Sequence, residues 1–238
     1  MIPKSLTYII VDLGAMLVPM LAGLDKRVYF YKYPWAVIGA ILLAATPFIA
    51  ADMLFTSWGV WGFTPEYVTG TYIGVLPLEE ILFFICIPFS CLFTYKAFYR
   101  YEIKWISAER GKQIAWFLVM FGLTSGLIFL DKWYTGTTML ALALALFLIL
   151  KFKPTFRFDI FFSAFAVLLL PFFICNGILT GTGPDQPVVW YNDLENLGVR
   201  MLTIPVEDTF YGMLLILLNC FFYDVFSGAL STKATTIK

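Results

Sequence analysis

Residues 35–54 read WAVIGAILLAATPFIAADML, a run of twenty residues in which Asp52 carries the only charge. An α-helix rises 1.5 Å per residue, so about 20 apolar residues cross the hydrocarbon core of a bilayer. Comparable apolar runs lie at 6–22, 74–99, 113–130, 135–150, 160–175 and 201–222. The sequence therefore predicts an all-α membrane protein, a helical bundle with about seven transmembrane helices.

The composition agrees with a membrane protein and excludes several other classes. Hydrophobic residues make up 61% of the 238-residue chain, charged residues make up 13%, and the mean hydropathy is +0.84. A soluble domain carries about 25% charged residues, so this chain lacks the polar surface that a water-soluble globule needs. No basic arm indicates binding to nucleic acid. The chain has no histidine, which excludes a histidine base, a haem histidine and His-containing zinc sites.

Lysine and arginine are divided unevenly between the loops on the two sides of the predicted bundle. Thirteen belong to one side, among them Lys233 and Lys238 near the C-terminus, and three, Lys4, Lys132 and Arg200, belong to the other. The positive-inside rule places the richer side in the cytoplasm. We therefore expect the N-terminus outside, the C-terminus in the cytoplasm, and the protein in the cell membrane of a prokaryote. The first apolar run is followed by further spans, so we expect a retained helix and not a signal peptide.

An internal repeat relates the two halves of the chain. The segment PFIAAD at 47–52 matches PFFICN at 171–176, 124 residues later, and PLEE at 77–80 matches PVED at 205–208, 128 residues later. One helix between two three-helix units restores the chain direction. The sequence thus predicts two parallel repeats related by an axis along the membrane normal. We assign 1–105 to the first repeat, 106–133 to the linker helix and 134–238 to the second.

The repeated acid pairs, Glu79 with Glu80 and Glu207 with Asp208, are the candidate catalytic residues. Acids behind a proline are also common at ordinary helix N-termini, which is the structural alternative. Here they lie near the membrane and recur in both halves, and acids in such a setting are costly and favour a functional role. Facing repeats would bring the pairs together, and clustered carboxyls in a low dielectric cannot all ionise. One of them would then be a general acid.

Other residues are candidates to support these acids. Asp52 and Asn176 end the matching helices of the two repeats, and Phe83 and Tyr211 lie one turn beyond the first acid of each pair. Trp61, Tyr72 and Trp190 belong to the glycine- and aromatic-rich loops that precede the acid pairs. Aromatic faces near the acids could line a cavity and stabilise a cation. For Asp12, a place in the site and a packing role both remain open.

Several cofactor-dependent functions lack their motifs. No glycine-rich dinucleotide fingerprint follows a strand, no Walker loop is present, and no aspartate-rich motif indicates a magnesium–diphosphate site. The last span has no lysine for a retinal Schiff base. For an enzyme, a redox-neutral reaction on a lipid-soluble substrate remains, and we expect neither a metal nor a cofactor.

The duplicated motifs at 77–80 and 205–208, with NGILTG at 176–181, resemble the heterodimer-type lycopene cyclase domain family in its fused arrangement, over nearly the whole chain. The resemblance implies closure of the ψ ends of lycopene to β rings, which gives γ-carotene and then β-carotene. We expect Glu79 or Glu207 to donate the proton, with Glu80 and Asp208 tuning the donor or taking the proton back. The implied partners are a carotenoid substrate and the bilayer, and other carotenoid enzymes are further candidates.

Three alternatives stay open at this point. A proton-coupled transporter of small solutes, like the SWEET carriers, also has three-plus-one-plus-three helices in parallel repeats. A receptor or sensor bundle has little support, because the chain has no lysine anchor and no signalling domain. Within the family that the chain resembles, a cyclase that makes ε rings or acts on longer carotenoids would have the same motifs.

Overall fold

A computed structural model describes residues 3–228, and in this range seven α-helices are long and apolar enough to cross a membrane. They are α1 (Thr7–Ala22), α2 (Pro34–Trp58), α3 (Leu78–Arg100), α4 (Ala108–Ile128), α5 (Trp133–Phe152), α6 (Phe158–Leu179) and α7 (Val206–Phe226). Single 3₁₀ turns lie at Lys4–Leu6, Phe30–Lys32 and Pro65–Tyr67. The predicted all-α bundle of seven spans is confirmed.

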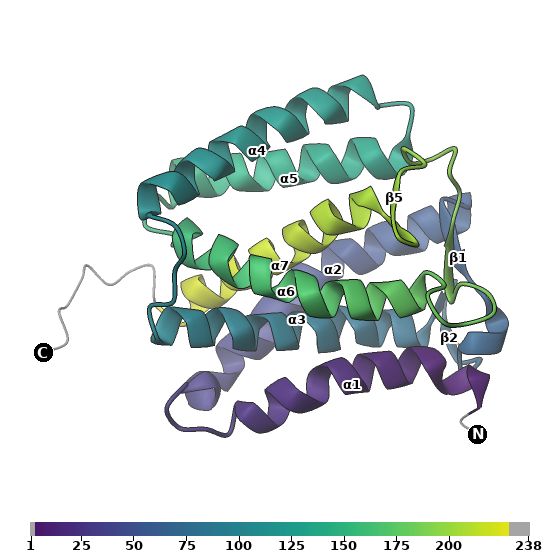
Figure 1. Ribbon diagram of the computed structural model, residues 1–238, viewed down its shortest axis with the longest axis horizontal. Helices are drawn as coiled ribbons and strands as arrows, with labels where there is room; N and C mark the ends of the chain where they lie inside the picture. Colours follow the sequence, from purple (N-terminus) through teal and green to yellow (C-terminus); the bar gives the residue numbers. More distant parts are fainter. Residues whose placement is uncertain (1–2, 229–238) are drawn as a thin grey trace, which may run out of the picture.

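The helices run side by side with alternating direction, as Figure 1 shows, with α4 and α5 along one edge and α1 along the other. Within each repeat the first helix packs on the third, α1 on α3 and α5 on α7. The second helix of each repeat crosses to the other repeat, so that α2 packs on α7 and α6 packs on α3. The two parallel three-helix repeats joined by α4 are therefore confirmed, and α3 and α7 form their shared centre.

The helices with the acid pairs begin several residues after the first residues of their apolar runs. Residues before them form two small antiparallel hairpins, β2 (Tyr72–Ile73) with β3 (Leu76–Pro77) and β5 (Arg200–Met201) with β6 (Ile204–Pro205). Each hairpin ends on a proline with extended backbone, at φ −64° and ψ 150° for Pro77 and φ −55° and ψ 139° for Pro205. Helical hydrogen bonding starts only after these prolines. The two helices therefore start within the proline–acid motifs at 77–80 and 205–208, four and five residues after the apolar runs begin at 74 and 201.

The two long loops at this end of the bundle pair with each other. Strand β1 (Trp61–Phe63) lies antiparallel to β4 (Val189–Tyr191), with Trp61 opposite Tyr191. The loops are 128 residues apart in sequence, and their pairing ties the first repeat to the second above the helix starts. Both stretches were predicted only as glycine- and aromatic-rich loops, and this contact between them was not predicted.

The linker helix α4 packs closely on α5 because small residues line its inner face. A Cβ atom at Gly122 would lie only 2.8 Å from the carbonyl oxygen of Met139, so only glycine allows this approach. Many large apolar side chains on the outer faces of the helices are exposed, as expected for helices that face lipid.

Basic residues and the paired loops lie at opposite ends of the bundle. The loops 23–33, 101–107 and 153–157, with the helix turns beside them, hold the basic side chains of the lysine-rich side that fall within the described residues. Lys233 and Lys238, which also entered the count, lie outside the described residues. The hairpins and the β1–β4 pair are at the other end, shown on the right of Figure 1.

Candidate active site

Hairpins of the same backbone geometry precede the two acid pairs. Gly74 and Leu202 are the equivalent turn residues of the two hairpins, and both have positive φ, 64° and 58°. The shared left-handed conformation is unfavourable for leucine, so the hairpin geometry is imposed by the surrounding fold. Each hairpin then delivers two consecutive acids to the first turn of α3 or α7.

The first acid of each pair holds the loop that precedes it. Glu79 Oε1 accepts a hydrogen bond from the backbone N–H of Thr69 at 2.7 Å, and Glu207 Oε1 accepts one from Leu197 N–H at 2.8 Å. Glu207 Oε1 also accepts from Thr135 Oγ1 at 2.6 Å. Both carboxyls are buried, and their second oxygens have no hydrogen-bond partner among the described residues. Glu79 and Glu207 are thus hydrogen-bonded to the backbone of the loops that precede them, and their carboxyls point away from the bundle centre.

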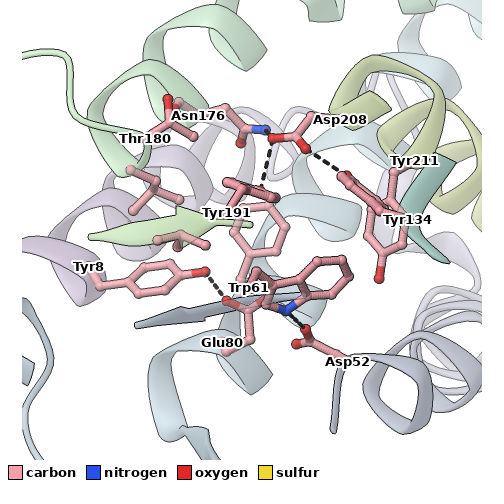
Figure 2. Close-up of a pocket in the computed structure, with 13 residues that line it drawn as sticks. Tyr8, Asp52, Trp61, Glu80, Tyr134, Asn176, Thr180, Tyr191, Asp208 and Tyr211 are labelled. Carbon is pink, nitrogen blue, oxygen red and sulfur yellow. Dashed lines mark hydrogen bonds between the residues drawn. The ribbon is translucent and has the colours of Figure 1, made fainter. Parts of the chain in front are cut away.

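The second acid of each pair faces a shared cavity. Adjacent helix residues point about 100° apart, so turning the first acid to the loop turns the second to the bundle centre. The cavity has a volume of about 60 Å³. It is lined by Tyr8, Asp52, Trp61, Glu80, Phe83, Tyr134, Asn176, Leu179, Thr180, Val189, Tyr191, Asp208 and Tyr211 (Figure 2).

A tyrosine from the first helix of each repeat donates to each of these acids. Tyr8 in α1 donates to Glu80 Oε2 at 2.5 Å, and Tyr134 in α5 donates to Asp208 Oδ1 at 2.6 Å. The tyrosines are 126 residues apart, close to the spacing of the other repeated motifs. The two repeats therefore contribute equivalent halves of one cavity, each with one acid and one tyrosine.

The two halves of the cavity differ in their other hydrogen bonds. Asp208 Oδ2 accepts from Tyr191 OH at 3.0 Å and from Asn176 Nδ2 at 3.4 Å. On the other side, Trp61 Nε1 donates to Asp52 Oδ1 at 2.5 Å, while Asp52 Oδ2 is buried without a partner among the described residues. Figure 2 marks these contacts with dashed lines.

Aromatic rings form most of the remaining wall. The Trp61 ring lies edge-on to Tyr134 at 5.0 Å between centroids, to Tyr191 at 6.1 Å and to Tyr211 at 6.2 Å. The β1–β4 pairing places Trp61 opposite Tyr191, so the contact between the long loops shapes this wall. Burial raises the pKa of the Tyr191 hydroxyl and the neighbouring Asp208 raises it further, so this hydroxyl keeps its proton and donates.

The structure brings most of the predicted site residues together. Glu80, Asp208, Asp52, Asn176, Phe83, Trp61 and Tyr211 all line the cavity. Four others do not: Glu79 and Glu207 hold the loops, and Tyr72 and Trp190 are 45% and 42% exposed. Successive residues of a strand face opposite sides, so Tyr191 points inward while its neighbour Trp190 packs on Gly62 from outside. Tyr72 and Trp190, predicted as supporting residues, therefore lie outside the wall of this cavity.

Three tyrosines, Tyr8, Tyr134 and Tyr191, were missing from the predicted site. Tyr8 and Tyr134 begin equivalent helices, and that repeat spacing was a usable signal. Asp12, one turn beyond Tyr8, is fully buried, and both of its carboxyl oxygens lack a partner among the described residues. It does not line the cavity, so the structure places it beside the site and not in its wall.

A comparison with known proteins identifies one family. A family model described as lycopene cyclase matches residues 5–98 and 131–226, the two repeats without α4. No curated protein and no solved structure matches the chain.

Proposed function

The chain belongs to the lycopene cyclase family and is a carotenoid cyclase, and on that premise we propose that it closes the ψ ends of lycopene to β rings, through γ-carotene to β-carotene. The observation that supports this best is the shared cavity of Glu80 and Asp208, one acid from each repeat. The family and the geometry give no support to the transporter alternative, because the acids line a cavity of only about 60 Å³ with aromatic walls.

The proposed reaction begins with a proton from one of these carboxyls. A protonated Glu80 or Asp208 adds its proton to C2 of the terminal double bond and leaves a cation at C1. The C5=C6 bond attacks C1 and closes the six-membered ring, which moves the cation to C5. Loss of the C6 proton to a carboxylate leaves the β ring. One proton is gained and one is lost, so nothing is oxidised or reduced.

The rest of the cavity suits the cation. The rings of Trp61, Tyr134 and Tyr211 line the same cavity as the acids, and an aromatic face attracts a cation more strongly when water is excluded. The tyrosine hydroxyls on Glu80 and Asp208 fix the direction in which each carboxyl points. The preferred donors are therefore the second acids of each pair. Glu79 and Glu207, expected earlier as donors, act as positioning residues that hold the loops over the cavity.

The identity of the ring, the unit boundaries and the membrane orientation are parts of the same proposal. The ring is β if C6 loses its proton, and an ε ring would require loss of a different proton.

We keep the division into 1–105, 106–133 and 134–238. We also keep the N-terminus outside, in a prokaryotic cell membrane, which places the acids near the outer face. Other carotenoid enzymes stay candidate partners.

The test is pigment formation in lycopene-accumulating bacterial cells, followed by membrane assays in D₂O. We expect cyclic carotenoids in which each new ring carries one deuterium at C2. The double bond of a β ring stays conjugated with the polyene chain and that of an ε ring does not, so absorption spectra separate the two. A membrane-inserted, folded protein that leaves lycopene linear would refute cyclisation, and ε rings would refute the β assignment alone.

A further inference from the structure

Two apolar grooves open from the sides of the bundle toward the acids, at positions that the repeats make equivalent. The α1–α6 groove has a volume of about 370 Å³ and is lined by α1, α3, α6 and α7, with Ala15 and Val18 on its α1 side. The α2–α5 groove has a volume of about 520 Å³ and is lined by α2, α5 and α7, with Ala141 and Leu144 on its α5 side. Ala15 and Val18 are each 126 residues before these counterparts, as Tyr8 is before Tyr134.

Only the first of these grooves reaches a carboxyl of the cavity. Phe83, Asn176, Asp208 and Tyr211 line both the cavity and the α1–α6 groove. The α2–α5 groove shares Tyr211 alone with the cavity, and its described lining residues include no acid. The larger groove is therefore the one that stops short of the reacting groups.

An aromatic contact explains the difference. In the α2–α5 groove the Phe48 ring meets the Tyr211 ring edge-on, 4.9 Å between centroids, and Tyr211 also contacts Tyr134 at 5.8 Å. The repeat equivalents of this pair are Phe172 and Phe83. Within the described part of the chain no ring contact joins those two, and both line the open α1–α6 groove. The contact between Phe48 and Tyr211 therefore separates the α2–α5 groove from the acids, and the α1–α6 groove has no equivalent contact among the described residues.

We propose that the α1–α6 groove is the binding track of the linear polyene, that Asp208 is the acid that meets its reacting end, and that Tyr211 closes the α2–α5 groove to the substrate. This rests on the proposed function. From Asp208 to Ile216 the track spans nine residues of α7, and the eight steps between them rise about 12 Å at 1.5 Å each. An extended carotenoid is longer, so its other end lies in the bilayer.

A single track has a consequence for the order of products. The distal ψ end stays in lipid while the first end reacts, because the second groove does not reach an acid. The half-cyclised product must then leave and return with its ends reversed. Monocyclic carotenoid is therefore a free intermediate, and it accumulates when enzyme is scarce relative to substrate.

Matched substitutions in the two grooves test the track. We expect Ala15→Phe to lower cyclisation in lycopene-accumulating cells by about tenfold or more, since a blocked approach misplaces the reacting atoms. Ala141→Phe at the equivalent place should stay within about twofold of wild type. A second pair, Val18→Trp and Leu144→Trp, replaces side chains that are 69% and 58% exposed, and so decides the matter if the alanine variants do not fold.

The outcomes separate this proposal from the proposed function. Folding is checked by size-exclusion chromatography in detergent. Losses confined to the α1–α6 variants support the track. Losses confined to the α2–α5 variants, equal losses in both grooves, or no loss in either would overturn it while the wild type still makes rings. A folded wild type that makes no rings refutes the proposed function, and the track with it.

Discussion

Replacing the first acid of each pair with alanine should reduce stability unequally in the two repeats. Glu207→Ala removes two hydrogen bonds, from Leu197 N–H and Thr135 Oγ1, whereas Glu79→Ala removes one, from Thr69 N–H. A donor left unpaired in a buried setting costs about 1–3 kcal/mol. Thr69 is exposed and its N–H can turn to water, so the cost for Glu79 lies at the lower end of that range.

These contacts give about 2–6 kcal/mol for Glu207→Ala and about 1 kcal/mol for Glu79→Ala. In a chain of this size each kcal/mol lowers Tm by about 2–4 °C. The assay is thermal unfolding of the detergent-purified variants, with Glu66→Ala, an exposed acid of the α2–α3 loop, as control. The folded fraction of each variant should still cyclise lycopene. An equal or larger loss for Glu79→Ala, or stable variants without activity, would show that these acids are not loop anchors.

Three further outcomes follow from individual contacts. Trp61→Phe removes the N–H donated to Asp52, so it should cost about 1–3 kcal/mol of unfolding free energy, seen as a lower Tm, and slow cyclisation; unchanged stability would contradict this. Gly122→Ala puts a Cβ 2.8 Å from a backbone oxygen of α5, and should lower Tm more than any gain in helix propensity raises it. Two hydrogen bonds from Arg157 lower the pKa of the Glu102 carboxyl. The ionised carboxyl therefore stabilises the fold at pH values above the usual glutamate pKa, and this contribution is lost as the pH falls through the lower pKa of the folded state. Glu102→Gln should flatten the curve of Tm against pH in that acidic range.

Most of the fold was predictable because the bilayer constrains it strongly. Apolar runs of about 20 residues can only be spanning helices, and the spacing of repeated motifs then fixed the parallel repeats. The proline–acid motifs at 77–80 and 205–208 indicated the two helix starts, but the hairpins before them were not predicted. The hairpins before Pro77 and Pro205 have sequences that continue the apolar runs, and only their backbone pairing reveals them.

The site was predictable as a set of segments but not as a set of facing side chains. Helix geometry requires that only one acid of each pair face the centre, yet it does not say whether that is Glu79 or Glu80. The choice depends on a hydrogen bond to the loop at Thr69, ten residues earlier, which no local pattern encodes. Likewise Trp190 and Tyr191 both fit an aromatic wall, and the register with β1 selects Tyr191.

The most direct measurement compares ring formation by Glu80→Gln and Asp208→Asn with that by wild type and Glu66→Gln, at equal amounts of folded protein in lycopene-loaded membranes. We expect both site variants to lose about a hundredfold or more of the rate, with Asp208→Asn the more severe, and the control to stay at the wild-type rate. Undiminished ring closure by a folded Glu80→Gln, Asp208→Asn double variant would contradict proton donation by these carboxyls.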